Sequence, residues 1–281
     1  MRRLIVNADD FGIHPARNRG VAEAVRAGVV TSVSLIANLE GFDDAIALLR
    51  TMPPVDVGLH LNLSEGRPLG ASYATLVGED GRFPGKLETR RRALEGRLAV
   101  GEIEAEIEAQ IARLRAAGVE PTHVDGHQHV HVYGLVVEAV ARAGRRHGVG
   151  WTRLPSEPTE PSARLPEERL EQIAEYRGHA ERSRTAMAAQ GLCAADHFRG
   201  LALSGRMTPE GLAALVRGLP EGTTELMVHP GRCRDWQGQL AVGSGFDCAD
   251  REAELTALLS PAFRRALDEA GVELVRRGQV A

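Results

Sequence analysis

The sequence of 281 residues is poor in cysteine and carries no excess of basic residues. Its three cysteines, Cys193, Cys233 and Cys248, lie far apart and form no CxxC pair, which argues against a disulfide framework and a structural zinc knuckle. We therefore expect a cytoplasmic protein whose cysteines serve only as packing residues. The formal net charge of −4 gives no electrostatic reason to bind nucleic acid or an anionic membrane, so we expect neither partner.

Long apolar runs are also missing from the sequence. No stretch approaches the length that spans a bilayer. Only three apolar residues follow Arg3 before the chain turns polar, too few for the apolar region of a signal peptide. No GxGxxG or GxxxxGK[ST] fingerprint follows the first expected strand, which weakens a nucleotide-binding interpretation.

What the sequence does contain is a cluster of histidines. Four of its ten histidines, His123, His127, His129 and His131, fall within nine residues. An extended chain would place them on one face together with Asp125, because side chains of a strand alternate between faces. Burying such groups without partners costs several kcal/mol each, so we expect water, hydrogen-bond partners or a metal at that face.

The order of expected elements predicts the fold class. Short apolar strands are expected at residues 4–7, 29–37, 55–63, 122–131, 149–154, 196–203, 224–231 and 271–275, and helical patterns separate most of them. Such alternation predicts an α/β fold with a parallel sheet, either doubly wound or closed into a (β/α) barrel. We expect one catalytic domain over residues 1–281, with the irregular stretch 64–101 as an insertion that forms a substrate wall.

Polar residues at the strand ends favour the barrel. Asp9, Asp10, His60, Arg153 and His229 all fall at or near carboxyl ends of expected strands, where barrel enzymes assemble their sites.

One carboxylate and two imidazoles form a suitable set of ligands for a catalytic metal. We interpret Asp10, His60 and His127 as candidate ligands of one divalent ion that keeps a position open for water. Such an ion lowers the pKa of its water toward roughly 7 and polarises a carbonyl, which makes hydrolysis of an amide or ester feasible. Asp9 would then take the proton of that water, and His229 is the candidate acid for the leaving amine.

Each residue also has an ordinary structural interpretation. Paired aspartates after a strand often belong to a turn, a histidine between leucines is often a core residue, and His229 before Pro-Gly could simply lie in a loop. Arg153 is either an ion-pair partner or an anchor for substrate and base. Asp125 and His129, like His123 and His131, are candidates for orienting the ligands, contacting substrate or lying at the surface.

Four motifs together resemble one known family. The motifs are NADDFG at residues 7–12, GLHLNL at 58–63, HVDGHQHVH at 123–131 and ELMVHPG at 225–231. In order and spacing they are similar to those of the YdjC-like carbohydrate deacetylases, over essentially the whole chain.

The resemblance implies a fold, an activity and a set of residue roles. The fold would be a distorted (β/α) barrel like that of the NodB-like polysaccharide deacetylases. The activity would be removal of acetyl groups from N-acetylated amino sugars, such as chitooligosaccharides, by a homodimer. Asp9 resembles the proton acceptor, His229 the histidine of the last motif, and Asp10, His60 and His127 the metal ligands. Magnesium is usual for the family, whereas these ligands suit zinc or cobalt at least as well.

Two rival functions stay open at this point. One is a catalytically inactive carbohydrate-binding protein of the same fold. The other is a barrel amidohydrolase or phosphoesterase, which usually gathers two metal ions.

Overall fold

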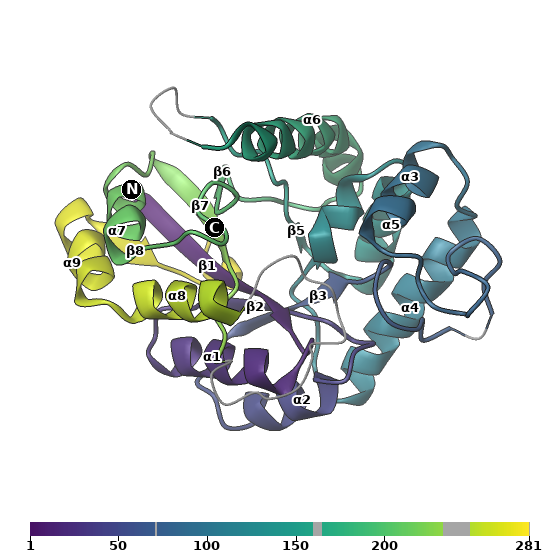
Figure 1. The fold of residues 1–281 in the computed structure, drawn as a ribbon, viewed down its shortest axis with the longest axis horizontal. Coiled ribbons are helices and arrows are strands. Elements are labelled where there is room, and N and C mark those ends of the chain that lie inside the picture. Colours follow the sequence, from purple (N-terminus) through teal and green to yellow (C-terminus); the bar gives the residue numbers. More distant parts are fainter. Residues whose placement is uncertain (71, 160–164, 233–247, 281) are drawn as a thin grey trace.

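A computed structural model describes residues 1–70, 72–159, 165–232 and 248–280. In this part of the chain eight parallel strands form one sheet (Figure 1). The strands are β1 (Arg2–Phe11), β2 (Ser32–Leu35), β3 (Asp56–Leu61), β4 (His123–Gly126), β5 (Trp151–Thr152), β6 (His197–Arg199), β7 (Gly222–Val228) and β8 (Val272–Leu274). Their order is β5-β4-β3-β2-β1-β7-β6, and β8 pairs with the first residues of β1.

Helices cover the outer side of this sheet, from α9 and α7 through α1 and α2 to α4 and α5 (Figure 1). The helices are α1 (Pro15–Arg26), α2 (Phe42–Leu49), α3 (Lys86–Leu94), α4 (Val100–Ala116), α5 (Val136–His147), α6 (Glu167–Ala189), α7 (Pro209–Arg217), α8 (Cys248–Leu259) and α9 (Pro261–Ala270), with short 3-10 segments η1 (His127–Val132) and η2 (Arg277–Gln279).

The predicted α/β architecture with a parallel sheet is confirmed, but the barrel is open. The edge strands β5 and β6 have two and three residues, and among the described residues they do not pair with each other. An isolated parallel bridge joins Trp151 of β5 to Cys193, which precedes β6. Strands this short leave few backbone groups for a ladder, so the sheet forms a curled half-barrel.

The elements follow from local chemistry that the sequence displays. All residues of β1 from Leu4 to Phe11 are buried, as expected of a strand covered on both faces. Helix α9 begins at Pro261, where Ser260 caps it by accepting a hydrogen bond from the Phe263 backbone, and it ends at left-handed Gly271. Such caps fix where a helix ends and where the next strand begins, as α9 and β8 do at Gly271 and Val272.

The predicted histidine strand is wrong beyond Gly126. The strand β4 ends there, and the chain turns into η1, in which Gln128 and His129 have left-handed φ angles of 55° and 60°. Because the turn redirects every following side chain, the cluster does not share one face. Only His123 and Asp125 keep the alternation of an extended chain.

Two helices were not expected from the sequence. Helix α3 lies inside the stretch 64–101, and its arginine-rich sequence has no apolar stripe that would reveal it. Helix α8 follows the undescribed residues 233–247. Cys233 lies outside the described residues, whereas Cys193 and Cys248 are free thiols. Within the described ranges, no helix combines the length and the hydropathy needed to cross a membrane.

Candidate metal centre and its cavity

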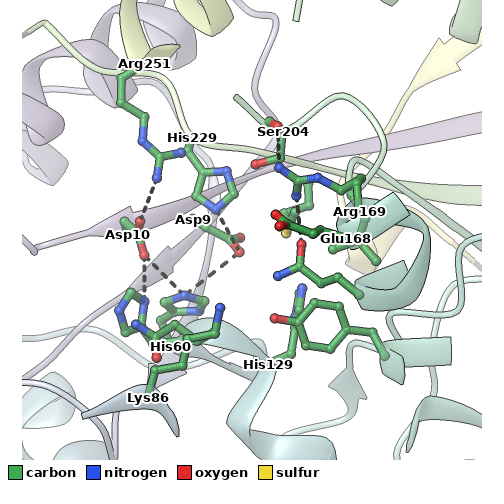
Figure 2. Close-up of a pocket in the computed structure, with 16 residues that line it drawn as sticks. Asp9, Asp10, His60, Lys86, His129, Glu168, Arg169, Ser204, His229 and Arg251 are labelled. Carbon is green, nitrogen blue, oxygen red and sulfur yellow. Dashed lines mark hydrogen bonds and ion pairs between the residues drawn. The ribbon is translucent and has the colours of Figure 1, made fainter. Parts of the chain in front are cut away.

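The carboxyl ends of the strands meet around one cavity of about 440 Å³. The structure brings together there all five residues that the sequence singled out for metal binding and proton transfer. Asp9 and Asp10 come from the end of β1, His60 from β3, and His229 follows β7 (Figure 2). His127 comes from the turn after β4. Arg153 and Asp125 do not line the cavity but lie behind it.

A distortion of β1 lets both aspartates face the cavity. Asp10 has a left-handed φ of 63°, and the register with β2 shifts between Ala8 and Phe11. In a regular strand consecutive side chains would point to opposite faces. Gly12 completes the turn with a φ of 89°, and a Cβ there would lie 2.6 Å from the Ile36 carbonyl oxygen. Asp10 is a non-glycine residue with a left-handed φ, which is uncommon in proteins as a whole. Such residues are concentrated at functional sites.

Asp10, His60 and His127 form a compact set of potential ligands. Their ligand atoms lie within 4.8 Å of one another and all three residues are buried. Asp10 Oδ1 is 2.9 Å from His127 Nδ1 and 3.5 Å from His60 Nε2. Among the described residues, His60 Nε2 has no hydrogen-bond partner. His60 Nε2 thus faces Asp10 without a hydrogen-bond partner of its own, and the three residues together fit a divalent ion.

The charges of this set also favour a cation. Burial opposes ionisation of Asp10, but His127 and His60 hold its pKa well below the usual range. Burial likewise lowers the pKa of His60 and of His127, yet Asp125 and Asp9 raise the first to about 10 and Asp10 raises the second to about 9. The site therefore attracts positive charge, which protons or a metal ion can supply.

Asp9 is held by a fully buried arginine. Arg153 donates to Asp9 Oδ2 at 2.6 Å and to Asp9 Oδ1 at 2.7 Å. The same guanidinium contacts Asp125 Oδ2 and Glu225 Oε1, each at 2.9 Å. Arg153 is thus an ion-pair partner and an anchor of Asp9, and it does not reach the cavity to anchor a substrate.

His229 and His60 lie on either side of Asp9 (Figure 2). The Nε2 atom of His229 is 3.9 Å from Asp9 Oδ2, and its Nδ1 is 3.8 Å from Glu254 Oε2. The Glu254 carboxylate also accepts the backbone N–H of His229 at 2.5 Å. Burial raises the pKa of Glu254, but its bonds to His229 outweigh this and lower it. An ionised Glu254 therefore orients the imidazole.

The other members of the histidine cluster play different structural parts. His129 lines the cavity and packs edge-on against Tyr176, with ring centroids 4.5 Å apart. His131 is buried and its Nε2 lies 3.0 Å from the Arg153 carbonyl oxygen. His123 is buried beside Ser34, whose hydroxyl donates to Asp125 Oδ2 at 2.7 Å. Burial lowers the pKa of all three histidines.

Most of the remaining cavity wall was missed by the sequence reasoning. It consists of Lys86, Gln128, Glu168, Arg169, Gln172, Tyr176, Leu201, Ser204, Met227 and Arg251. Several of these lie on α3 and on the first turns of α6, whose polar sequences look like solvated helix faces. Glu225 did carry a signal, because a carboxylate inside an apolar strand needs a buried partner.

Comparisons with known proteins agree with this architecture. A model of the family described as YdjC-like protein matches residues 3–269. A carbohydrate deacetylase of Mus musculus is 38% identical and aligns with 97% of this chain and 93% of its own. A chitooligosaccharide deacetylase of Klebsiella pneumoniae (strain 342) is 34% identical, with 97% of both chains aligned. The crystal structure of a protein assigned to cellobiose-phosphate cleavage in Enterococcus faecalis V583 shares the fold, with a TM-score of 0.76, 23% identity and coverage of 100% and 99% of the two chains.

Proposed function

This chain belongs to the YdjC-like protein family, and on that premise we propose that it is a metal-dependent deacetylase of N-acetylated amino sugars. The observation that carries the proposal is the set Asp10, His60 and His127 beside Asp9 in one cavity. The names of the Mus musculus and Klebsiella pneumoniae relatives support the reaction and the class of substrate.

Asp10, His60 and His127 would hold one divalent ion. When bound, the ion supplies an acidic water at neutral pH and a positive charge for the acetyl oxygen. Two imidazoles and one carboxylate are a ligand set that suits zinc, while magnesium prefers oxygen ligands alone. We therefore propose zinc for this chain, with magnesium as the alternative that metal analysis decides.

Asp9 is proposed as the base of the reaction. Its carboxylate reaches the cavity while Arg153 and the Asn7 amide, which donates to Oδ1 at 2.8 Å, fix its position. A carboxylate held in this way stays in place as it accepts a proton from the attacking water. Hydrolysis of the amide then yields acetate and a free amine.

His229 is proposed as the acid for the departing amine. Its imidazole lines the same cavity, 3.9 Å from Asp9, so that one group can take a proton while the other gives one. With Glu254 at Nδ1, the Nε2 atom is left directed to the cavity.

The cavity wall supports a sugar as the substrate. Tyr176, Leu201 and Met227 offer apolar surface, while Glu168, Gln172 and Ser204 offer hydrogen-bonding groups suited to hydroxyls. Among the described residues of the stretch 64–101, Lys86 at the start of α3 is the one that lines the cavity. That contact supports our proposal that this stretch forms one substrate wall of a single catalytic domain.

Acetate release from N-acetylglucosamine oligomers tests the proposal. The protein would be stripped of metal, loaded separately with zinc, cobalt or magnesium, and analysed for metal content. We expect activity with at least one metal at one ion per chain. A second ion per chain would favour the amidohydrolase or phosphoesterase alternative, and sugar binding without acetate release would favour the inactive one.

The homodimer and the cytoplasmic setting stay predictions. Light scattering coupled to size-exclusion chromatography tests the dimer by giving the mass of the particle directly.

A further inference from the structure

The two candidate histidine ligands are arranged in the same way around different carboxylates. His60 turns Nε2 toward Asp10 Oδ1, at 3.5 Å, and its Nδ1 lies 2.7 Å from Asp125 Oδ1. His127 turns Nδ1 toward Asp10 Oδ1, at 2.9 Å, and its Nε2 lies 3.4 Å from Glu65 Oε2. Each ring therefore has one nitrogen facing the metal set and one facing a carboxylate outside it. His60 faces the metal set through Nε2, whereas His127 faces it through Nδ1.

Glu65 is held in this position by hydrogen bonds and is largely shielded from solvent. Its side chain is only 11% exposed, and its Oε1 accepts a hydrogen bond from Gln128 Nε2 at 2.8 Å. Asn62 fixes the backbone: its Oδ1 accepts the N–H of Glu65 at 3.1 Å, and its Nδ2 donates to the Glu65 carbonyl at 2.8 Å. Asn62 follows His60 by two residues, so the end of β3 supplies one ligand and the support of another.

The surroundings of Glu65 leave His127 as its charge partner. Within the described ranges, the Glu65 carboxylate forms a single ion pair, with His127. Among the described residues neither Glu65 Oε2 nor His127 Nε2 has a hydrogen-bond partner, so the two atoms face each other at 3.4 Å without a competing group. Glu65 stands outside the set of atoms that lie within 4.8 Å of one another around Asp10. It is thus placed to support a ligand and not to be one.

We propose that Glu65 is a positioning residue for the metal, which holds the Nε2–H of His127 so that His127 binds the ion through Nδ1. His60 binds through Nε2 with Asp125 in the matching role. This inference rests on the proposed function, because it assumes a divalent ion at Asp10, His60 and His127. Carboxylates that hold the second nitrogen of a histidine ligand typically contribute 10- to 100-fold to metal affinity.

Zinc affinity, measured against a competing chelator, tests the role of Glu65 without any substrate. The variants are Glu65→Gln, Glu65→Asp and, as a matched control, Glu102→Gln. Glu102 belongs to α4 and accepts the backbone N–H groups of residues 74–76. We expect zinc binding to weaken about 10- to 100-fold in Glu65→Gln, to recover partly in Glu65→Asp, and to stay unchanged in Glu102→Gln.

Long-range nitrogen NMR of the histidine rings supplies a second readout that a purely structural role would not move. In the zinc-loaded protein we expect His127 to be metal-bound at Nδ1 and protonated at Nε2, and His60 the reverse. Wild-type zinc affinity in Glu65→Gln, or His127 bound through Nε2, would overturn the inference while leaving the proposed function intact. Failure of the wild-type protein to bind zinc, cobalt or magnesium would overturn both. Should Glu65→Gln not fold, the ring assignments in the wild-type protein still decide.

Discussion

Arg153 donates to both carboxylate oxygens of Asp9, at 2.6 and 2.7 Å, and neither side chain is more than 3% exposed. The pair joins the end of β5 to the end of β1 directly behind the cavity. Two further carboxylates, those of Asp125 and Glu225, share the same guanidinium. One guanidinium thus contacts three buried carboxylates. The position of Asp9 therefore depends on Arg153, which does not line the cavity.

Replacing Arg153 by methionine should be severely disruptive. The change takes the arginine away from Asp9 and removes one of the cationic partners of Asp125 and of Glu225, which keep His60 and Arg277. Breaking a buried pair typically costs about 3–5 kcal/mol. We expect urea unfolding to show a loss of this size and deacetylation to fall with kcat rather than with KM. Arg217→Met is the matched control, because its pair with Glu269 is exposed and should contribute about 1 kcal/mol or less. Equal losses in the two variants would show that Arg153 has no special role.

Zinc should raise the melting temperature of the metal-free protein. An ion that binds only the native state at 100 times its dissociation constant stabilises by about 2.7 kcal/mol, or roughly 5 °C for a chain of this size. Calorimetry with and without zinc measures the shift. Asp10→Asn, which removes one ligand of the set, should lose most of it. A melting temperature indifferent to zinc, cobalt and magnesium would contradict the metal site.

His229→Asn should separate catalysis from metal binding. His229 stands outside the ligand set, so the metal content of the variant should match that of the wild-type protein. Loss of a general acid typically lowers kcat by about 10²- to 10⁴-fold. His147→Asn is the control, since that histidine pairs with Glu108 between α4 and α5. Full activity in His229→Asn would remove this residue from the proposed mechanism.

The stability of the metal-free protein should fall on acidification through His131. Burial lowers the pKa of His131 to about 4, against the opposing effect of Asp125. An unfolded histidine titrates near 6.5, so below that pH the unfolded state binds a proton that the native state does not. The contribution of His131 is therefore complete above pH 6.5 and decreases as the pH falls toward 4, by about 3 kcal/mol at most.

Urea unfolding of the wild-type protein and His131→Gln between pH 7.5 and 5 measures this slope. We expect the difference in slope below pH 6 to approach 1.36 kcal/mol per pH unit, about one proton. His197→Gln, whose ring contacts the Glu221 carbonyl near the surface, should keep the wild-type slope. Parallel curves of unfolding free energy against pH for all three proteins would mean that the buried His131 is not neutral in the native state.

The sequence was sufficient for the sheet and for the meeting of the key residues. The apolar run of β1 and the stripe of Ile103, Ile107 and Ile111 on α4 follow from periodicity alone. Parallel strands place their carboxyl ends at one edge, so residues that end separate strands had to meet. This topological rule, and not any single motif, predicted that Asp9, Asp10, His60, His127 and His229 would gather.

Backbone turns and buried ion pairs could not be predicted in the same way. The left-handed angles of Gln128 and His129 belong to residues that usually avoid them, so alternation suggested a longer strand. Arg277 forms an ion pair with Glu225 at 3.1 Å and extends the chain of charges from Arg153, but no motif surrounds it in the sequence. Partners of this kind are fixed by tertiary packing across distant segments.

Asp9→Asn at full metal occupancy is the most direct test of the account. The variant keeps the size of the side chain and lies outside the ligand set of Asp10, His60 and His127, but it cannot accept a proton. Acetate release from an N-acetylglucosamine oligomer would be measured beside the zinc content of each sample. We predict one zinc ion per chain in both proteins and a fall in kcat of at least about 100-fold in the variant. Wild-type acetate release by Asp9→Asn would contradict the account.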